Sequence, residues 1–372
     1  MTSEERREAR FRRRTGKRQA ARARAIGQAD NYDAVFTFGN LYQAYRCCRR
    51  GVSWKSSVQR YICQAPLNVY ATWERLQKGT YRSPGFFEFD LYERGKKRHI
   101  RSTVIGERVV QRCLCDHALV PVLKRQFIHD NGASMRCKGY DFAVRRITQH
   151  LREHIRKHGR EGYILLFDFS KFFDRISHPL MKGIISRSFR DTRLVGLIHH
   201  FIDMFGDVGL GLGSQISQVL ALAAANRLDH CCKEMLRIRG YGRYNDDGYL
   251  IHESKDYLLR CLNAIQRVCD GLGVTLNRRK THIFKLSHGF SWLKIRFRVS
   301  ETGRVIRKVY KRSITKMRQK LKKLAARARA GKMSFQSVYH AFSSWRAYAS
   351  RFDTWHTIQN MTRLYQQLTE GS

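Results

Sequence analysis

The chain has 372 residues, of which 42% are hydrophobic and 12% aromatic, so it is long enough to bury a sizeable core. Lysine and arginine together number 72 against 30 aspartates and glutamates, which gives a formal net charge of +42. This excess is larger than solubility requires and favours a polyanionic partner, most often nucleic acid, although a membrane surface would also attract it.

The sequence contains no run of about 18 apolar residues and no signal-peptide core. We therefore expect a soluble, cytoplasmic protein without a membrane partner. The ten cysteines include the adjacent pairs Cys47-Cys48 and Cys231-Cys232, and none forms a CxxC pair. They are expected to be reduced and structural, because neither a zinc ribbon nor a disulfide framework fits this spacing.

The first 25 or so residues are rich in arginine and poor in apolar residues. This composition predicts a solvated arm, or a helix that is stabilised when it binds. An RNA-binding arm and a disordered tail without a specific role both fit it. A mitochondrial transit peptide is disfavoured because Glu4, Glu5 and Glu8 lie within the segment.

The next part of the chain is predicted to be mainly helical, with one β-hairpin. Apolar residues spaced three and four apart predict helical regions at 38–76, 108–127 and 139–158. Alternation of side-chain character predicts a strand at 86–92, which follows a turn at 82–85. A second turn at 93–96 leads to its hairpin partner at 98–104.

The second half of the chain mixes strands and helices. The apolar run 163–168 predicts a strand buried on both faces. Helices are expected at 178–205, 214–235 and 255–271, with a glycine-rich loop at 206–213. Short strands are expected at 274–276, 282–286, 290–299 and 304–309, the last two forming a hairpin. The tail from Ser313 is basic and helical, and Gly331 divides it.

Two adjacent carboxylates occur in the segment Tyr244-Asn245-Asp246-Asp247, between two β-favouring stretches. A tight turn there, with Gly248 easing the backbone, would hold both acids at the tip of a hairpin. Paired carboxylates on a rigid turn bind hard divalent cations such as Mg²⁺. An ordinary aspartate-rich hairpin loop would carry the same dipeptide.

A third carboxylate, Asp168, ends the buried strand about 80 residues earlier. A lone buried carboxylate is costly unless it is paired or bound to a cation, although an aspartate here would also cap the following helix. Three carboxylates on two strands of a very basic protein suggest a two-metal nucleotidyl-transfer site.

These motifs resemble those of bacterial reverse transcriptases. Phe167 to His178 resembles their motif A, and Tyr244 to Asp247 resembles motif C. Further segments in the family's order are similar to two fingers motifs, motif D and the primer-grip hairpin: 98–111, 127–143, 271–281 and 289–297. The resemblance implies an α+β right-hand polymerase of fingers and palm with a helical C-terminal thumb. The implied ranges are an arm at 1–30, fingers and N-terminal palm elements at 31–160, palm at 161–300 and thumb at 301–372.

The family's catalytic roles fall on matching residues. Asp168, Asp246 and Asp247 would hold two Mg²⁺ ions, or Mn²⁺, with a further metal contact from the backbone at Phe169. One ion would activate the primer 3′-hydroxyl, and the other would neutralise the triphosphate and the leaving pyrophosphate. Lys280 matches a lysine proposed to protonate that pyrophosphate.

Two further residues would contact the incoming nucleotide. Arg98 would bind the triphosphate as a bidentate donor. Phe173 matches the bulky steric gate that excludes a ribose 2′-hydroxyl, which implies the use of dNTPs. Simple core packing is the alternative role of Phe173.

The segment from Leu212-Gly213 to Ser217-Gln218 distinguishes subfamilies. Group II intron and retron enzymes usually have Gln-Gly and then Ser-Pro there, whereas this chain resembles reverse transcriptases of diversity-generating retroelements. In that subfamily the substitution lies against the templating base and is associated with misincorporation opposite adenine. Asn245 departs from the family pattern, in which Ala or Met is commoner, and this difference bears on primer positioning.

The function implied by the resemblance is RNA-templated addition of dNTPs to a DNA or RNA primer, in a bacterial or phage-encoded protein. A small accessory RNA-binding protein would help to present the template. The residues after position 300 resemble a thumb, and we expect no RNase H domain among them. Two alternatives are an antiphage-defence or retron-like reverse transcriptase and a non-catalytic RNA-binding protein on a polymerase scaffold.

Overall fold

The structure is a computed structural model that describes residues 2–93 and 96–370. Its contacts divide the chain into two compact units, each built from three separate segments. Unit 1 comprises Met1–Gly139, Phe169–Met235 and Ala264–Leu276. Unit 2 comprises Tyr140–Asp168, Leu236–Asn263 and Asn277–Ser372.

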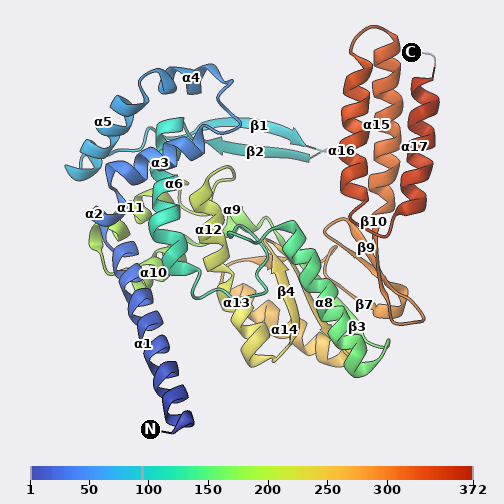
Figure 1. Cartoon of the computed structure of the whole chain (residues 1–372), viewed down its shortest axis with the longest axis horizontal. Helices are drawn as coiled ribbons and strands as arrows, with labels where there is room; N and C mark the ends of the chain where they lie inside the picture. Colours follow the sequence, from blue (N-terminus) through green and yellow to red (C-terminus); the bar gives the residue numbers. More distant parts are fainter. Residues whose placement is uncertain (1, 94–95, 371–372) are drawn as a thin grey trace. The chain divides into compact units, whose positions relative to one another are not determined.

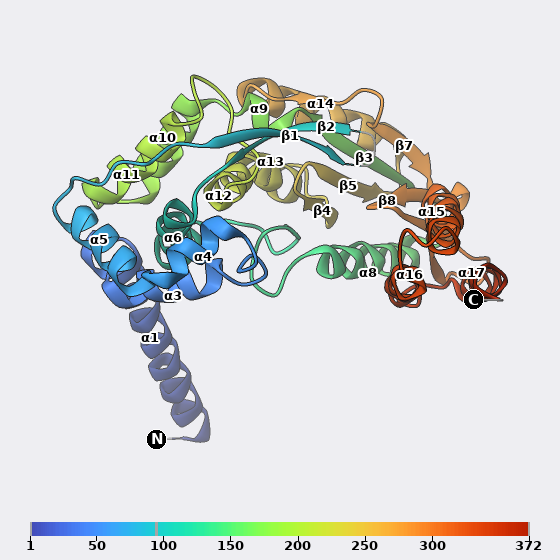
Figure 2. The same ribbon diagram turned by 90° about the horizontal axis from the view of Figure 1, so that it is seen from above.

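Unit 1 is mostly helical (Figure 1). Its α-helices are α1 (Ser3–Ala29), α2 (Tyr32–Val35), α3 (Phe38–Cys48), α4 (Ser56–Cys63), α5 (Ala65–Gln77), α6 (Ile105–Leu114), α7 (Val120–Leu123), α9 (Phe172–Arg175), α10 (His178–Ser188), α11 (Thr192–Asp203), α12 (Gln215–Ala224) and α13 (Asn226–His230). Two π-helical turns, η1 (Cys115–Leu119) and η2 (Cys231–Met235), follow α6 and α13. Figure 2 shows that the basic arm forms the long helix α1, which extends away from α2 and α3.

Several predicted helices of unit 1 are broken where local chemistry requires it. The region 38–76 is three helices, because Gly51 has a left-handed backbone (φ +73°) and Pro66 lies in the first turn of α5. The region 178–205 is two helices, since the Asp191 carboxylate caps α11 by accepting from two backbone N–H groups. Within 108–127, Pro121 lacks an N–H, and the π-turn η1 precedes it.

The strands of unit 1 are few. β1 (Phe87–Glu93) and β2 (Lys96–Ser102) form the expected antiparallel hairpin, and β2 ends two residues before the predicted limit. The centre of its predicted turn, Arg94-Gly95, lies outside the described residues. β6 (Thr275–Leu276) pairs with the last two residues of β3 (Tyr163–Ser170).

Unit 2 is organised around an antiparallel sheet. Its strand order is β4 (Gly240–Tyr244), β5 (Asp247–His252), β3 and then β7 (His282–Lys285). Helix α8 (Tyr140–His158) packs against this sheet, and a smaller sheet is formed by β8 (Phe290–Trp292), β9 (Ile295–Val299) and β10 (Val305–Val309). A single apolar core joins them, including Ile147, Leu151, Ile164, Ile251, Phe290 and Phe297. Helix α14 (Lys255–Gly271) begins in unit 2 and ends in unit 1.

The predicted strand 290–299 is in fact two strands. Leu293 and Lys294 form a tight turn between β8 and β9 with backbone φ angles of +47° and +63°. A two-residue hairpin turn of this kind normally carries Asn or Gly, which tolerate a positive φ. The sequence Leu-Lys gives no such signal, so the residue pattern predicted one strand, whereas the resemblance of 289–297 to the primer-grip hairpin did imply a hairpin here.

The C-terminal part of unit 2 is a bundle of three helices, α15 (Lys311–Arg329), α16 (Phe335–Ala349) and α17 (Trp355–Thr369) (Figure 1). Their shared core includes Leu321, Val338, Phe342 and Met361. The break at Gly331 was expected, but a second break between α16 and α17 was not. There the Asp353 carboxylate accepts a hydrogen bond from the Arg307 backbone N–H at 2.9 Å, which ties the second loop to β10.

All ten cysteines are free thiols, as expected. None of the helices in the described part of the chain is both long enough and apolar enough to cross a bilayer.

Candidate active site

The β4–β5 hairpin positions the predicted carboxylates. Asp247 pairs with Tyr244 across the hairpin and with Asp168 on the neighbouring strand β3. Directly opposed residues on adjacent strands place their Cβ atoms about 4.5–5.5 Å apart, on one face. Asn245 begins the turn with φ +53°, a conformation that Asn tolerates better than most residues. Buried Arg243 donates to the Asn245 carbonyl at 2.7 Å and supports the turn.

Gly248 has a different role from the one expected. It is the second residue of β5, and its φ is not positive, so it does not ease the turn. A Cβ atom there would lie 2.1 Å from the Phe167 ring of β3. Glycine is therefore needed for packing directly beside the carboxylates.

Asp168, Asp246 and Asp247 converge within unit 2. One carboxylate oxygen from each lies within 4.8 Å of those from the other two. Asp168 is only 3% exposed, and its Oδ1 has no hydrogen-bond partner within the described ranges. A buried, unpartnered carboxylate oxygen beside two other acids is costly unless a cation binds there. The all-oxygen donor set fits a hard divalent cation such as Mg²⁺.

The other oxygen of Asp168 is held by two side chains. Lys280 Nζ lies 2.6 Å from Asp168 Oδ2, and the Asn277 amide donates to the same atom at 3.3 Å. The Asn277 backbone N–H also donates to the Asp168 carbonyl at 2.7 Å. Sequence reasoning found Lys280 but gave Asn277 no role. The sequence feature that could have indicated Asn277 is its position at the start of the turn that leads to Lys280. There the Asn277 side chain accepts a hydrogen bond from the Arg279 N–H.

The clustered charges shift the proton affinities of the site. Burial, followed by repulsion from Asp246 and Asp168, raises the pKa of Asp247 to about 7. Burial and the Asp168 charge also raise the pKa of Asp246. Burial lowers the pKa of Lys280, but its hydrogen bond to Asp168 and the three carboxylates outweigh this effect and raise it overall. The Lys280 ammonium thus offsets only part of the negative charge of the three carboxylates, and a bound cation would offset the rest.

We expect the metal-free protein to lose stability as the pH rises from about 4 to about 7. The pKa of Asp247 is higher in the folded state than its ordinary value of 3.8, so the folded protein binds this proton more tightly. The contribution of this proton to the free energy of unfolding is fully present below the pKa of the unfolded state. It falls by at most about 1.4 kcal/mol per pH unit until the pH reaches the pKa of the folded state. Melting curves in EDTA should show a shallower decline for Asp247→Asn than for the wild type. Equal pH profiles would contradict this prediction.

A cavity of about 380 Å³ lies beside the carboxylates in unit 2. Asp247 and Lys280 line one part of it, and Trp292, Arg296 and Tyr310 line another. Sequence reasoning assigned 289–297 to a primer grip, and the structure brings that segment to the same cavity as two predicted catalytic residues. The cavity therefore offers space next to the cluster for a bound group.

The remaining predicted site residues belong to unit 1. The Phe173 carbonyl accepts from the Leu210 N–H at 2.6 Å, and the Leu212 carbonyl accepts from the Arg101 N–H at 3.1 Å. Gly213 has φ +113°, and a Cβ there would lie 3.0 Å from the Arg101 carbonyl oxygen. Both the left-handed backbone and the close approach of β2 require glycine at this position.

The other predicted site residues of unit 1 have different surroundings. Ser217 is buried with an unpartnered hydroxyl, and Gln218 Oε1 accepts from Ser134 Oγ at 3.2 Å. The buried Phe169 ring stacks on Phe172, with centroids 4.7 Å apart. Arg98 pairs through its backbone with Leu91, and its side chain lies outside the described atoms.

A buried polar chain in unit 1 was missed by sequence reasoning. Tyr81 donates to Glu107, Gln111 donates to Glu107 at 3.0 Å, and Ser214 donates to Gln111 at 2.8 Å. Glu107 is only 1% exposed. The chain fixes the start of α12, immediately after Leu212-Gly213, against α6. A lone Glu and Gln four residues apart give little signal of such burial.

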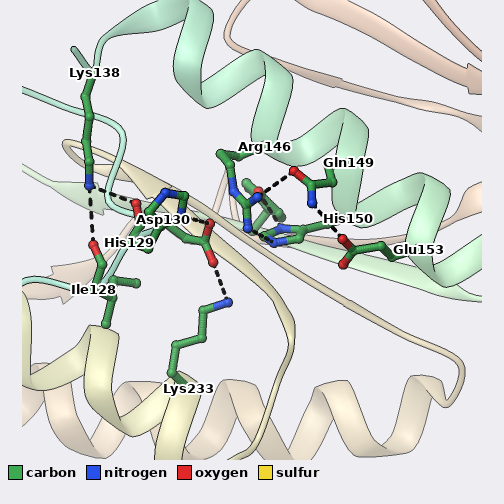
Figure 3. A network of polar contacts seen from close by, with 10 residues as sticks. Ile128, His129, Asp130, Lys138, Arg146, Gln149, His150, Glu153 and Lys233 are labelled. Atoms are coloured by element: carbon green, nitrogen blue, oxygen red, sulfur yellow. Dashed lines mark hydrogen bonds and ion pairs between the residues drawn. The ribbon is translucent and has the colours of Figure 1, made fainter. Parts of the chain in front are cut away.

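The predicted fingers segment 127–143 also contains an ordered polar contact. The Lys138 ammonium donates to the His129 carbonyl at 2.8 Å, and Lys233 is paired with Asp130 at 2.7 Å (Figure 3). Both contacts lie within unit 1. They fix the loop between α7 and α8.

Comparison with known proteins gives one family. The model of the family described as reverse transcriptase (RNA-dependent DNA polymerase) matches residues 93–297. This range includes Asp168, Asp246, Asp247 and Lys280. No curated protein sequence matches the chain.

Two solved structures are similar to the chain. One is telomerase from Candida albicans in complex with a TWJ fragment of telomeric RNA, with a TM-score of 0.48 and 10% identity, covering 84% of this chain and 66% of that one. The other is apo telomerase from Candida tropicalis truncated from its C-terminal domain, with a TM-score of 0.44 and 14% identity, covering 65% of this chain and 60% of that one. The chain thus spans less than two thirds of either.

Proposed function

The chain belongs to the reverse transcriptase (RNA-dependent DNA polymerase) family of nucleotidyltransferases, with a right-hand polymerase fold, and we propose that it copies RNA into DNA by two-metal nucleotidyl transfer. The observation that carries the proposal is the cluster of Asp168, Asp246 and Asp247, with a buried unpartnered oxygen on Asp168. We assign the arm, fingers with N-terminal palm elements, palm and thumb to 1–30, 31–160, 161–300 and 301–372. RNA template, DNA or RNA primer and dNTPs are the proposed substrates.

The predicted site residues have distinct parts in this reaction. Asp168, Asp246 and Asp247 would hold two Mg²⁺ ions, with the Phe169 backbone as a further contact. The bound ions would supply the positive charge that favours loss of the primer 3′-hydroxyl proton and that neutralises the pyrophosphate. The 3′-oxygen bonds to the α-phosphorus as the bond to the bridging oxygen breaks, and the hydroxyl proton passes to water. Lys280 gives a proton to the departing pyrophosphate, and Arg98 binds its phosphates.

Primer extension with the purified full chain tests the proposed reaction. The mixture holds an RNA template, an annealed primer, dNTPs and Mg²⁺, and the control lacks template. We expect template-dependent extension, and Mn²⁺ should replace Mg²⁺. A chain that binds RNA but extends no primer would favour a non-catalytic RNA-binding protein on a polymerase scaffold and overturn the proposal.

We base the proposed subfamily on the loop before α12 and on the first turns of that helix. Leu212-Gly213 and Ser217-Gln218 favour an error-prone enzyme of a diversity-generating retroelement, of bacterial or phage origin, with a small accessory RNA-binding protein. An antiphage-defence or retron-like reverse transcriptase is the second candidate. Flanking template and variable repeats that differ at adenines would support the retroelement, and their absence would favour defence.

Leu212→Gln should lower misincorporation opposite template adenine by roughly tenfold. A polar side chain at this position restores a hydrogen-bonding contact to the nascent base pair, and such contacts discriminate far better than an apolar one. Sequencing of cDNA made on a defined template measures the error spectrum. Leu259→Gln, on the half-exposed face of α14, is the matched control and should leave the spectrum unchanged. An unchanged spectrum in Leu212→Gln would remove the support for the retroelement.

Phe173→Ala should admit ribonucleotides, raising their incorporation relative to dNTPs by roughly 10–200-fold. Phe173 is half-buried and follows the carboxylate strand by a short turn, so the Ala variant opens space where a 2′-hydroxyl would otherwise meet the ring. Single-nucleotide incorporation with matched rNTP and dNTP gives the ratio. Phe173→Tyr retains the bulk and should retain discrimination. An Ala variant that folds and still excludes rNTPs would assign Phe173 to core packing.

A further inference from the structure

Unit 2 contains a second cavity, of about 470 Å³, at the other end of the β4–β5 hairpin. One wall is the C-terminal half of α8, and the opposite wall is formed by 237–240 and 251–253. β5 runs from Asp247 to His252, and a strand rises about 3.4 Å per residue, so this cavity lies roughly 17 Å along the strand from the carboxylates. It shares no lining residue with the cavity beside Asp247 and Lys280.

The walls of this cavity carry an excess of positive charge. Four exposed cationic residues line it: Arg156, Lys157, Arg237 and Arg239. The two carboxylates in the lining already have partners. Gln149 donates to Glu153 at 2.8 Å, as Figure 3 shows, and His158 is paired with Glu253. Within residues 2–93 and 96–370, no acidic side chain forms an ion pair with Arg156, Lys157 or Arg237.

Helix chemistry explains only part of this charge. Cationic residues favour the last turn of a helix because its carbonyl groups carry partial negative charge, which accounts for Arg156 and Lys157 on α8. It does not account for Arg237 and Arg239, which precede β4 on the opposite wall. Arg237 also has a left-handed backbone (φ +48°), a conformation that is unfavourable for a residue with a long side chain.

The arginine-bearing wall is firmly held. Ile238, between the two arginines, is 2% exposed and anchors the segment in the core. The Tyr257 hydroxyl donates to the Leu236 carbonyl at 2.9 Å, and the Tyr257 ring packs on His252. The opposite wall is held by His150, whose Nδ1 lies 2.9 Å from the Tyr249 hydroxyl. The cationic residues therefore lie on two walls that are anchored in the folded core.

We propose that this cavity binds phosphate groups of an RNA segment other than the one paired at the carboxylate cluster. Guanidinium and ammonium groups that converge from two walls match the phosphodiester backbone in charge and in hydrogen-bond donors. This inference rests on the proposed function in one respect, which is that the polyanion is taken to be RNA. The protein would then have a second RNA-binding site, separate from the site where the template strand is copied.

RNA binding by Arg156→Gln/Arg237→Gln tests this site. The probe is a long RNA without primer, titrated against the full chain in EDTA at several KCl concentrations, so the assay needs no catalysis. We expect roughly tenfold weaker binding, and a salt dependence that is shallower by about 1.4 because two phosphate contacts are lost. The matched control is Arg145→Gln/Arg152→Gln, which removes two exposed charges from α8 outside the cavity. It should keep wild-type affinity.

Three outcomes would overturn the proposal. Equal weakening in the control pair would show that only total charge matters. Unchanged RNA affinity in the cavity variant would exclude RNA at the site. Stabilisation of the wild type, but not of the variant, by inorganic phosphate or adenosine monophosphate, with RNA affinity unchanged, would assign the cavity to a small anion. Photo-crosslinking of thiouridine-labelled RNA to wild-type protein needs no variant to fold, and peptides from 150–158 or 236–240 should be labelled.

These results are distinguishable from failure of the proposed polymerase. A short primer–template duplex without flanking RNA should be extended normally by Arg156→Gln/Arg237→Gln, because the carboxylate cluster is untouched. If neither wild type nor variant extends any primer while the cavity variant binds RNA weakly, the polymerase proposal fails and the RNA site stands.

Discussion

Asp246→Asn should reduce primer extension by about a thousandfold or more while leaving RNA binding intact. The substitution removes one of three clustered carboxylates, and metal stabilisation of the transferring phosphate contributes several kcal/mol, with each 1.4 kcal/mol worth a factor of ten in rate. Because Asn has nearly the same shape and relieves repulsion among buried acids, the variant should fold at least as stably as the wild type without metal. Single-turnover extension measures the rate, and melting curves in EDTA check the fold.

The control for this experiment is Asp256→Asn. Asp256 is exposed in the first turn of α14 and makes no contact with the cluster, so its neutralisation should leave the rate unchanged. Asp168→Asn and Asp247→Asn should behave like Asp246→Asn, since all three belong to one site. A folded Asp246→Asn protein that extends primers at the wild-type rate would exclude the cluster as the catalytic centre.

The carboxylate cluster could be predicted because the place of each acid on its own strand is a local property of the sequence, and the family resemblance implied that the two strands meet. A buried apolar run ending in Asp168 and a hairpin ending in Asp246-Asp247 need only pair in one sheet to bring the acids together, and β3 and β5 do so. Lys280 was found by resemblance, and its 2.6 Å contact with Asp168 lies within the same unit.

What could not be predicted depends on contacts between distant residues or on backbone conformations that carry no residue signal. The Leu293-Lys294 turn lacks Asn and Gly, and the role of Gly248 depends on the Phe167 ring of another strand. The basic cavity joins α8 to a segment about 80 residues later, and its arginines were only part of a large overall charge. In a chain with 72 basic residues, composition alone does not single out those that line a site.

Lys280→Met should slow the chemical step by roughly 10²–10⁴-fold, the range that a positioned general acid contributes. In the metal-free protein the ammonium lies on Asp168 Oδ2, where it neutralises part of the cluster. A cation that binds Asp168 competes with this contact, so the Met variant should bind Mn²⁺ at least as tightly as the wild type. A fall in maximal rate without a rise in the metal concentration required would separate proton donation from metal binding.

Lys280→Arg tests whether the positive charge of Lys280 is sufficient without its ability to donate a proton. It keeps the positive charge near Asp168, but guanidinium gives up a proton far less readily than ammonium. Metal-free stability should therefore resemble that of the wild type, whereas extension should be slowed nearly as much as in Lys280→Met. If Arg restored the rate, charge neutralisation alone would explain Lys280, and the proton for pyrophosphate would have to come from water. The pair of variants thus assigns Lys280 to one of two chemical roles that its position beside Asp168 allows.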